Sequence, residues 1–169
     1  MMKQIRLNVT MKVSNMYEFL LRHSYSGWGG VGSVLFSLAL FVYLIVGHES
    51  LNQGQTILVT FGALLFTVIN PVVILFNATK QVKLNPTFRD LLTYTLSEEG
   101  ILVEQNGQEL LVKWEEVQKV VETKQSVIIY LTKVRAFILP KYVIADDMNE
   151  VKEIIAGSML QEKCKWKKA

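Results

Sequence analysis

Two long apolar runs constrain the fold of this chain more than any other feature of its sequence. They extend from about Trp28 to Val46 and from about Ile57 to Phe76, and a short polar link joins them. Glu49, in that link, is the one Asp, Glu, Lys or Arg between Arg22 and Lys80. Crossing the apolar core of a bilayer, roughly 30 Å thick, takes about 20 apolar residues in a helix. The two runs therefore predict a transmembrane helical hairpin.

The alternative interpretation of the runs is a pair of buried helices in a soluble bundle. Such helices normally carry a polar face, and neither run has one. Hydrophobic residues make up 50% of the chain, and its mean hydropathy is +0.27. The first run follows a polar stretch and no small-x-small cleavage pattern comes after it, so it is expected to be a retained span.

The charges beside the runs predict the orientation of the hairpin. Basic residues flank it on both outer sides, whereas the link is acidic. They are Lys3, Arg6, Lys12 and Arg22 before the first run, and Lys80, Lys83 and Arg89 after the second. Because positive charge favours the cytoplasmic side, we expect a multi-pass protein of the cell membrane with both termini in the cytoplasm.

Small residues recur every four positions in the first span, at Gly29, Ser33 and Ser37. Such a stripe lets a second helix approach closely, and the second span is the expected partner. Homo-oligomerisation through the same stripe is the alternative. In the second span, Asn70-Pro71 predicts a kink, because proline lacks the backbone N–H that the helix would use.

Aromatic and basic residues near both ends of the chain are candidates for contact with the membrane surface. Trp28 opens the first span, where an amphipathic indole favours the bilayer interface. The basic tail, 162–169, alternates lysine with other residues around one tryptophan and could contact anionic lipids or be solvated. The candidates there are Lys165, Trp166, Lys167 and Lys168.

The region after the hairpin, 85–161, has the pattern of a small sheet domain. Short alternating or apolar runs are separated by turn residues, of which Asn106-Gly107 gives the strongest hairpin signal. Six strands are predicted: Leu92–Ser97, Ile101–Gln105, Leu110–Lys113, Val117–Glu122, Ser126–Thr132 and Arg135–Leu139. A helix follows, with Asp146 or Asp147 as its cap and Glu150 completing a capping box. The sequence therefore predicts an antiparallel meander closed by a C-terminal helix.

The N-terminal region, 1–25, is expected to hold one strand and one amphipathic helix before the hairpin region, 26–79. Residues Gln4 to Thr10 alternate apolar and polar side chains, and the helical pattern begins near Ser14. A single strand is not stable in water, and the sheet after Leu91 is predicted on the same side of the membrane. We therefore expect Gln4–Thr10 to join an edge of that sheet, which makes the hairpin an insertion into one domain.

Six or seven antiparallel strands closed by one helix outline a pleckstrin-homology-like (PH-like) barrel or sandwich, so the fold class is membrane α+β. Three segments carry a closer resemblance, Tyr94–Ile101, Trp114–Glu122 and Ala136–Lys141. They resemble the YcxB-like family of small bacterial membrane proteins, which implies two spans followed by such a domain. Trp114 is expected in its core, where an indole supplies a large apolar area.

The residue types exclude several classes of function. The only cysteine, Cys164, excludes an intrachain disulfide and a cysteine-based metal cluster, and is expected to be solvated in the tail. His23 and His48 fall on opposite sides of the predicted membrane, and no nucleophile set or glycine-rich phosphate loop is found. Lysines scattered among glutamates argue against nucleic-acid binding. We therefore expect no catalytic residues, metal or cofactor.

Two functional hypotheses remain. The first is a membrane-anchored cytoplasmic interaction module that binds a protein, a peptide or a lipid head group. The alternative is an accessory or immunity-type membrane protein that protects against membrane-active peptides or assists a transporter. A neighbouring bacteriocin or transporter gene would favour the alternative.

Overall fold

The N-terminal strand, β1 (Gln4–Val9), belongs to the C-terminal domain. The computed structural model describes residues 4–166, and there β1 pairs antiparallel with β2 (Leu92–Ser97) along its whole length. The chain divides into two compact units, one formed by Met1–Met16 with Gln81–Ala169 and the other by Tyr17–Lys80. We call them the sheet domain and the helical unit. The predicted pairing is confirmed, and the helical unit is an insertion between β1 and β2.

The first sheet has the strand order β1-β2-β3-β4 and is antiparallel throughout. Its other strands are β3 (Gly100–Gln105) and β4 (Gln108–Lys113). Asn106 and Gly107 join them with φ angles of 49° and 77°, the left-handed conformation of a two-residue hairpin turn. On β1, Ile5, Leu7 and Val9 point into the core and the residues between them are exposed, as the alternation predicts.

The second sheet has the order β7-β6-β5-β8. Its strands are β5 (Lys119–Glu122), β6 (Ser126–Tyr130), β7 (Ala136–Pro140) and β8 (Cys164–Lys165). The expectation of a closed barrel is wrong, because the strands of the described chain form two separate four-stranded sheets. The chain leaves the first sheet at a short 3-10 turn, η3 (Trp114–Glu116), so the predicted single meander becomes two.

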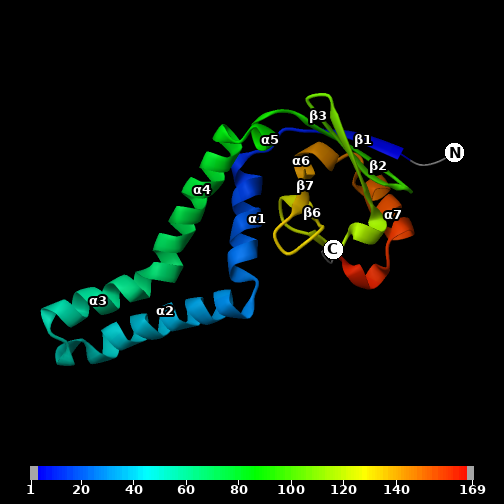
Figure 1. Cartoon of the computed structure of the whole chain (residues 1–169). Helices are drawn as coiled ribbons and strands as arrows, with labels where there is room; N and C mark the ends of the chain where they lie inside the picture. Colours follow the sequence, from blue (N-terminus) through cyan, green and yellow to red (C-terminus); the bar gives the residue numbers. More distant parts are fainter. Residues whose placement is uncertain (1–3, 167–169) are drawn as a thin grey trace. The chain divides into compact units, whose positions relative to one another are not determined.

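One hydrophobic core joins the two sheets and the C-terminal helix. Helix α6 (Lys141–Ile144) follows β7, and α7 (Met148–Ser158) comes next in the chain (Figure 1). On α7, Val151, Ile154 and Ile155 are buried in the core that both sheets share. Trp114 is buried in this core and its Nε1 donates to the Ser97 carbonyl at 2.9 Å, which confirms its predicted role. Burial also raises the pKa of the Tyr94 phenol far above its usual range, so Tyr94 stays neutral.

The predicted capping box of α7 is wrong. Asp147 stands at the N-cap with φ −104° and ψ 5°, and its side chain makes no capping hydrogen bond. An N-cap side chain reaches the first turn from an extended backbone, and Asp147 is not extended. After α7, the turn η4 (Gln161–Lys163) leads to β8, which pairs parallel with β5.

The helical unit is built from two apolar segments in a hairpin. Helix α1 (Val13–Tyr25) leads into it, followed by α2 (Trp28–Gly47) and the turn η1 (His48–Ser50). The second segment comprises α3 (Gln53–Leu64), a π-helical turn η2 (Leu65–Ile69) and α4 (Asn70–Leu84). Figure 1 shows the bend between α3 and α4, next to the predicted kink at Asn70-Pro71. A short helix, α5 (Pro86–Arg89), precedes β2.

Candidate functional site

Helices α2 and α3 are joined by a side-chain hydrogen bond at Ser37. This serine is fully buried, its Oγ donates to the Gly62 carbonyl at 3.1 Å, and the Phe66 N–H donates to it at 3.4 Å. A Cβ placed on Gly62 would lie 2.7 Å from Leu40 Cδ1, so a larger residue there would require the Leu40 side chain to move. Gly62 was not found from the sequence, because it lies outside any repeating pattern of small residues.

The other two residues of the predicted stripe, Gly29 and Ser33, make no hydrogen bond to α3 among the described contacts. Ser33 Oγ donates to the Gly29 carbonyl of its own helix at 2.8 Å. Gly29 is exposed, and a Cβ there would meet nothing within 4 Å. Of the three stripe residues, Ser37 is thus the one that makes hydrogen bonds to the second apolar segment, to Gly62 of α3 and Phe66 of η2. The packing role of Gly29 and Ser33 stays a prediction.

Three polar groups meet at the bend of the second segment. In the π-helical turn the Asn70 N–H bonds to the Leu65 carbonyl, and Pro71 has no N–H to offer the Phe66 carbonyl. The Tyr25 hydroxyl donates to that Phe66 carbonyl at 2.7 Å, and Asn70 Nδ2 donates to the Tyr25 oxygen at 2.9 Å. The end of α1 therefore supplies the donor that the bend removes from the backbone.

Removing the Tyr25 hydroxyl is expected to destabilise this bend. In Tyr25→Phe, the Phe66 carbonyl loses its donor and the Asn70 amide loses its acceptor, which costs about 1–2 kcal/mol for a part-buried pair. Thermal unfolding of the purified chain in detergent measures the loss. Tyr43→Phe is the matched control, since the Tyr43 side chain is exposed. Equal stability of the two variants would contradict this role for Tyr25.

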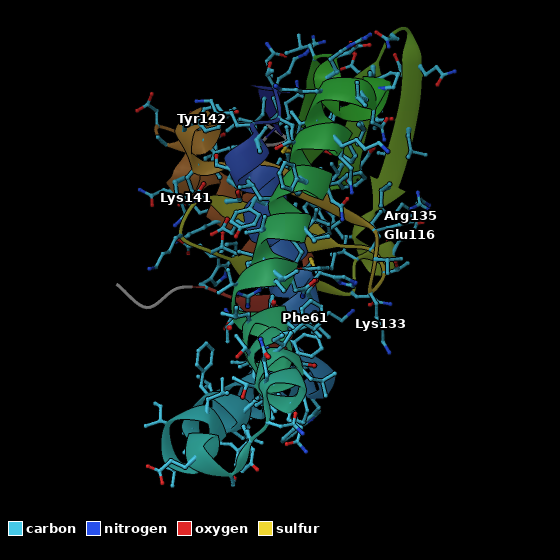
Figure 2. All side chains as sticks on the ribbon, turned by 90° about the vertical axis from the view of Figure 1, so that its left-hand side faces the viewer. Phe61, Glu116, Lys133, Arg135, Lys141 and Tyr142 are labelled. Carbon is cyan, nitrogen blue, oxygen red and sulfur yellow. The ribbon has the colours of Figure 1, made fainter. Side chains whose placement is uncertain are left out.

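The two apolar segments bury few of their side chains. Trp28–Gly47 and Gln53–Leu84 are both long and apolar enough to cross a membrane, and only 6% and 11% of their most apolar windows are buried. Trp28, the first residue of α2, is 96% exposed. Phe61 on α3 is exposed as well, and Figure 2 shows it among the outward-pointing side chains.

The described part of the C-terminal tail packs onto the sheet domain. Cys164 pairs with Val120 of β5, and both Cys164 and Trp166 pack against the hydrophobic core, so the expectation of a solvated cysteine is wrong. Lys152 Nζ lies 5.3 Å from the centroid of the Trp166 ring. Lys165 is exposed. Membrane contact by Lys165 and Trp166 stays a prediction, and Lys167 and Lys168 lie outside the described residues.

Partial burial is expected to slow the alkylation of Cys164. Burial raises the pKa of its thiol, so less reactive thiolate is present at a given pH. Iodoacetamide should modify Cys164 several-fold more slowly in the folded chain than in denaturant, and its rate should rise at higher pH than that of an exposed thiol. Gln108→Cys with Cys164→Ser provides the exposed comparison. Equal alkylation rates at positions 108 and 164 would show that the Cys164 thiol does not pack against the hydrophobic core.

Contacts within the sheet domain hold the first turn of α1 and the residues just before it. Asn15 Nδ2 donates to Ser126 Oγ at 3.1 Å, and both side chains are buried. The Tyr142 hydroxyl donates to the Thr10 carbonyl, and Lys12 Nζ lies 3.9 Å from the centroid of the Tyr142 ring. Figure 2 labels Tyr142 and its neighbour Lys141 on α6. The segment between β1 and the inserted unit is therefore fixed to the domain before the chain leaves it.

A buried carboxylate braces the second sheet. Glu122 accepts from Lys141 Nζ at 2.6 Å and from Lys152 Nζ at 3.0 Å, which ties β5 to α6 and α7. Two cations around one carboxylate compensate the cost of burying it. The arrangement is thus a structural brace.

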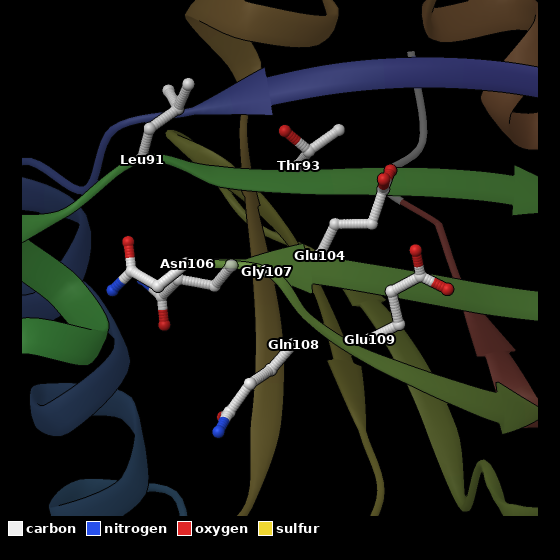
Figure 3. A pocket seen from close by; sticks show the side chains of 8 residues that line it. Leu91, Thr93, Glu104, Asn106, Gly107, Gln108 and Glu109 are labelled. Carbon is white, nitrogen blue, oxygen red and sulfur yellow. The ribbon is translucent and has the colours of Figure 1, made fainter.

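An open hollow of about 320 Å³ lies on the outer face of the first sheet. It is lined by polar residues near the β3–β4 turn, among them Thr93, Glu104 and Glu109 (Figure 3). Glu104 pairs with Arg6 at 3.2 Å. Within residues 4–166, no three His, Cys, Asp or Glu side chains gather as metal ligands. The hollow offers carboxylate, amide and hydroxyl groups for hydrogen bonding.

Fold and contacts together define an α+β protein in which a sheet domain carries an inserted hairpin of exposed apolar helices. Residues 96–155 match the family described as "YcxB-like protein". The chain is 27% identical over 128 residues to "Uncharacterized protein YcxB" of Bacillus subtilis (strain 168), which covers 74% of this chain and 69% of that protein. No solved structure matches the chain significantly. The two sequence matches confirm the resemblance to the YcxB-like family.

Proposed function

We propose that this chain is a membrane-anchored interaction module of the bacterial cell membrane. In this proposal the helical unit crosses the bilayer as a hairpin, and the sheet domain lies on the cytoplasmic side. The domain then binds a protein, a peptide or a lipid head group close to the membrane. Its two packed sheets and closing helix are proposed as an open, PH-like arrangement.

The exposure of the two apolar segments is the observation that carries the proposal. A soluble hairpin of this composition would have to bury its apolar surface against other elements of the chain. Instead, the outward side chains include Leu35, Val42, Ile57 and Phe61, all more than half exposed. In lipid these side chains need no protein partner, and the helical backbone satisfies its own polar groups.

Two further features support the orientation and the anchoring. Basic residues flank the inserted unit and Glu49 stands in its link, which favours cytoplasmic termini. The first turn of α1 is fixed to the sheet domain through Asn15, and Thr10, just before the helix, is bonded to Tyr142. Helix α1 starts as part of the sheet domain and continues into the helical unit, which would make the anchor an integral part of the fold.

Membrane insertion and orientation are tested first. The full chain, expressed in bacteria, should stay in the membrane pellet after alkaline carbonate washing. With Cys164→Ser as background, Ser50→Cys should react with an impermeant maleimide in intact cells, whereas Gln108→Cys should react only after permeabilisation. Release by carbonate would overturn the anchoring, and the reverse labelling pattern would overturn the orientation.

The ligand class is tested with the purified full chain in nanodiscs. Native membranes treated with a crosslinker should yield a protein partner whose capture depends on exposed residues of the sheet domain, such as Lys133 and Arg135, both labelled in Figure 2. A lipid ligand would instead appear as quenching of Trp166 by brominated anionic lipids but not by brominated neutral lipids. If neither occurs and deletion of the gene sensitises cells to membrane-active peptides, the protective alternative replaces this proposal.

A further inference from the structure

The outer edge of β4 is a strand edge without a partner. In the first sheet, β4 is the last strand, and no strand of the described chain pairs with its other side. Five of its six residues are exposed, including Leu110 and Leu111 at 50% and 46%. Natural sheets usually guard such an edge with charges, proline or a covering element, because it is a template for further pairing. On β4 two leucines occupy the middle of the strand.

The hairpin turn fixes which groups of β4 face outward. Gln105 and Gln108 close a two-residue turn and therefore form a hydrogen-bonded pair. Pairs alternate along an antiparallel ladder, so Glu109, Leu111 and Lys113 direct their N–H and C=O groups away from β3. The Lys113 N–H is already bonded to the Glu116 carboxylate at 3.1 Å. The free backbone groups are therefore centred on Leu111.

The charges of β4 match an antiparallel copy of the same strand. If Leu111 pairs with Leu111 of a second copy, Glu109 of each chain lies opposite Lys113 of the other. Within its own sheet Glu109 lies opposite Glu104, an unfavourable pair of like charges, and Lys113 lies opposite Gly100. Figure 3 shows Glu104 and Glu109 on the adjoining strands. The second copy would thus give each charge the opposite-sign neighbour that its own sheet lacks.

We propose that two copies of this chain associate through antiparallel pairing of their β4 strands about Leu111, which joins the two four-stranded sheets into one eight-stranded sheet. Four backbone hydrogen bonds form, two between the Leu111 residues and two from the Glu109 N–H groups to the Lys113 carbonyls. This register is self-complementary, as a two-fold symmetric contact requires. The association is independent of which ligand the module binds.

Crosslinking of single cysteines in the full chain tests the register. With Cys164→Ser as background, Leu111→Cys should form a disulfide-linked dimer upon mild oxidation, because facing residues in such a pair have Cα atoms about 5.5 Å apart. Glu109→Cys is the matched control, since the two copies of residue 109 would lie about 13 Å apart along the strands. A dimer from Glu109→Cys alone, or equal yields from both, would overturn the register.

Charge reversal separates this contact from dimerisation through the helices. In detergent, Glu109→Lys and Lys113→Glu should each weaken dimerisation about tenfold, whereas the double reversal should restore it. Light scattering measures the dimer fraction, and circular dichroism checks the fold of each variant. A dimer unaffected by either single reversal, a double reversal as weak as the singles, or a monomeric wild-type chain would overturn the proposal.

Discussion

A chain without residues 1–10 is expected to lose the fold of the sheet domain, which lies more than 80 residues further along the sequence. Those residues include β1, whose Ile5, Leu7 and Val9 are buried in the core shared by both sheets. Burying three such side chains contributes about 5–9 kcal/mol, comparable with the whole stability of a typical domain. The cooperative unfolding transition should therefore disappear, as measured by circular dichroism during a urea titration.

A soluble variant makes this measurement cleaner. Replacing residues 17–80 with a flexible Gly/Ser linker keeps β1 and the first turn of α1 attached to residues 81–169, and the matched variant lacks residues 1–10. Within the first variant, Leu7→Ala should cost about 2–5 kcal/mol, whereas Arg6→Ala, on the exposed face, should cost less than about 1 kcal/mol. If residues 85–169 fold with unchanged stability on their own, the pairing of β1 with β2 has no energetic importance.

Ser37→Leu is expected to cause the largest single-residue loss of stability in the helical unit. Leucine at this fully buried position would press on the Gly62 backbone, and its side chain cannot bond to the Gly62 carbonyl or the Phe66 N–H. Overpacking costs about 1–3 kcal/mol and each lost hydrogen bond adds about 1 kcal/mol. The purified chain in detergent should therefore unfold at a distinctly lower temperature than the wild type.

Gly29→Leu is the control that separates this contact from the sequence pattern. Both positions belong to the same stripe, but a Cβ at Gly29 meets no neighbouring atom. The structure therefore predicts near wild-type stability for Gly29→Leu, whereas the stripe alone predicts a loss for both variants. If Gly29→Leu is destabilised, a helix must pack against the Gly29 face of α2. That helix would be α3 in another arrangement or a helix of a second copy of the chain.

Much of the fold was accessible from the sequence because local patterns coincide with tertiary ones. Alternation at Ile5, Leu7 and Val9 marks a strand with one buried face, and that face requires a sheet elsewhere in the chain. Asn106-Gly107 fixes the β3–β4 turn and hence the register of two strands. Charge-free apolar runs mark α2 and the longer segment that ends in α4.

The features that the sequence does not reveal depend on partners distant in the chain. Strand β8 has two residues, too few for a periodic pattern, and its place beside β5 follows from packing against the core. The split into two sheets arises at Trp114, whose burial turns the chain between β4 and β5. Pro71 indicates that one backbone carbonyl in the second segment lacks its usual N–H donor. The neighbouring sequence does not identify Tyr25 as the residue that supplies a donor instead.

The contacts of the candidate site are harder to predict from the sequence, because their partners are also distant along the chain. In the structure, Ser37 is the stripe residue that bonds to α3. Its partner Gly62 belongs to no sequence motif, so the sequence does not identify this contact. The side-chain bonds that hold Asn15 and Tyr142 join positions 111 and 132 residues apart. Such pairs follow from the completed fold and not from spacing along the chain.

The insertion between β1 and β2 also dictates an order of events during synthesis. Strand β1 leaves the ribosome first, but Val9 and Gln4 pair with Leu92 and Ser97, which are made 83 and 93 residues later. At roughly 5–20 residues per second, β1 waits about 4–19 s for its partner. Both apolar segments are synthesised before then, so the whole helical unit leaves the ribosome while β1 is still unpaired. The sheet domain can therefore close only after the helical unit has been made.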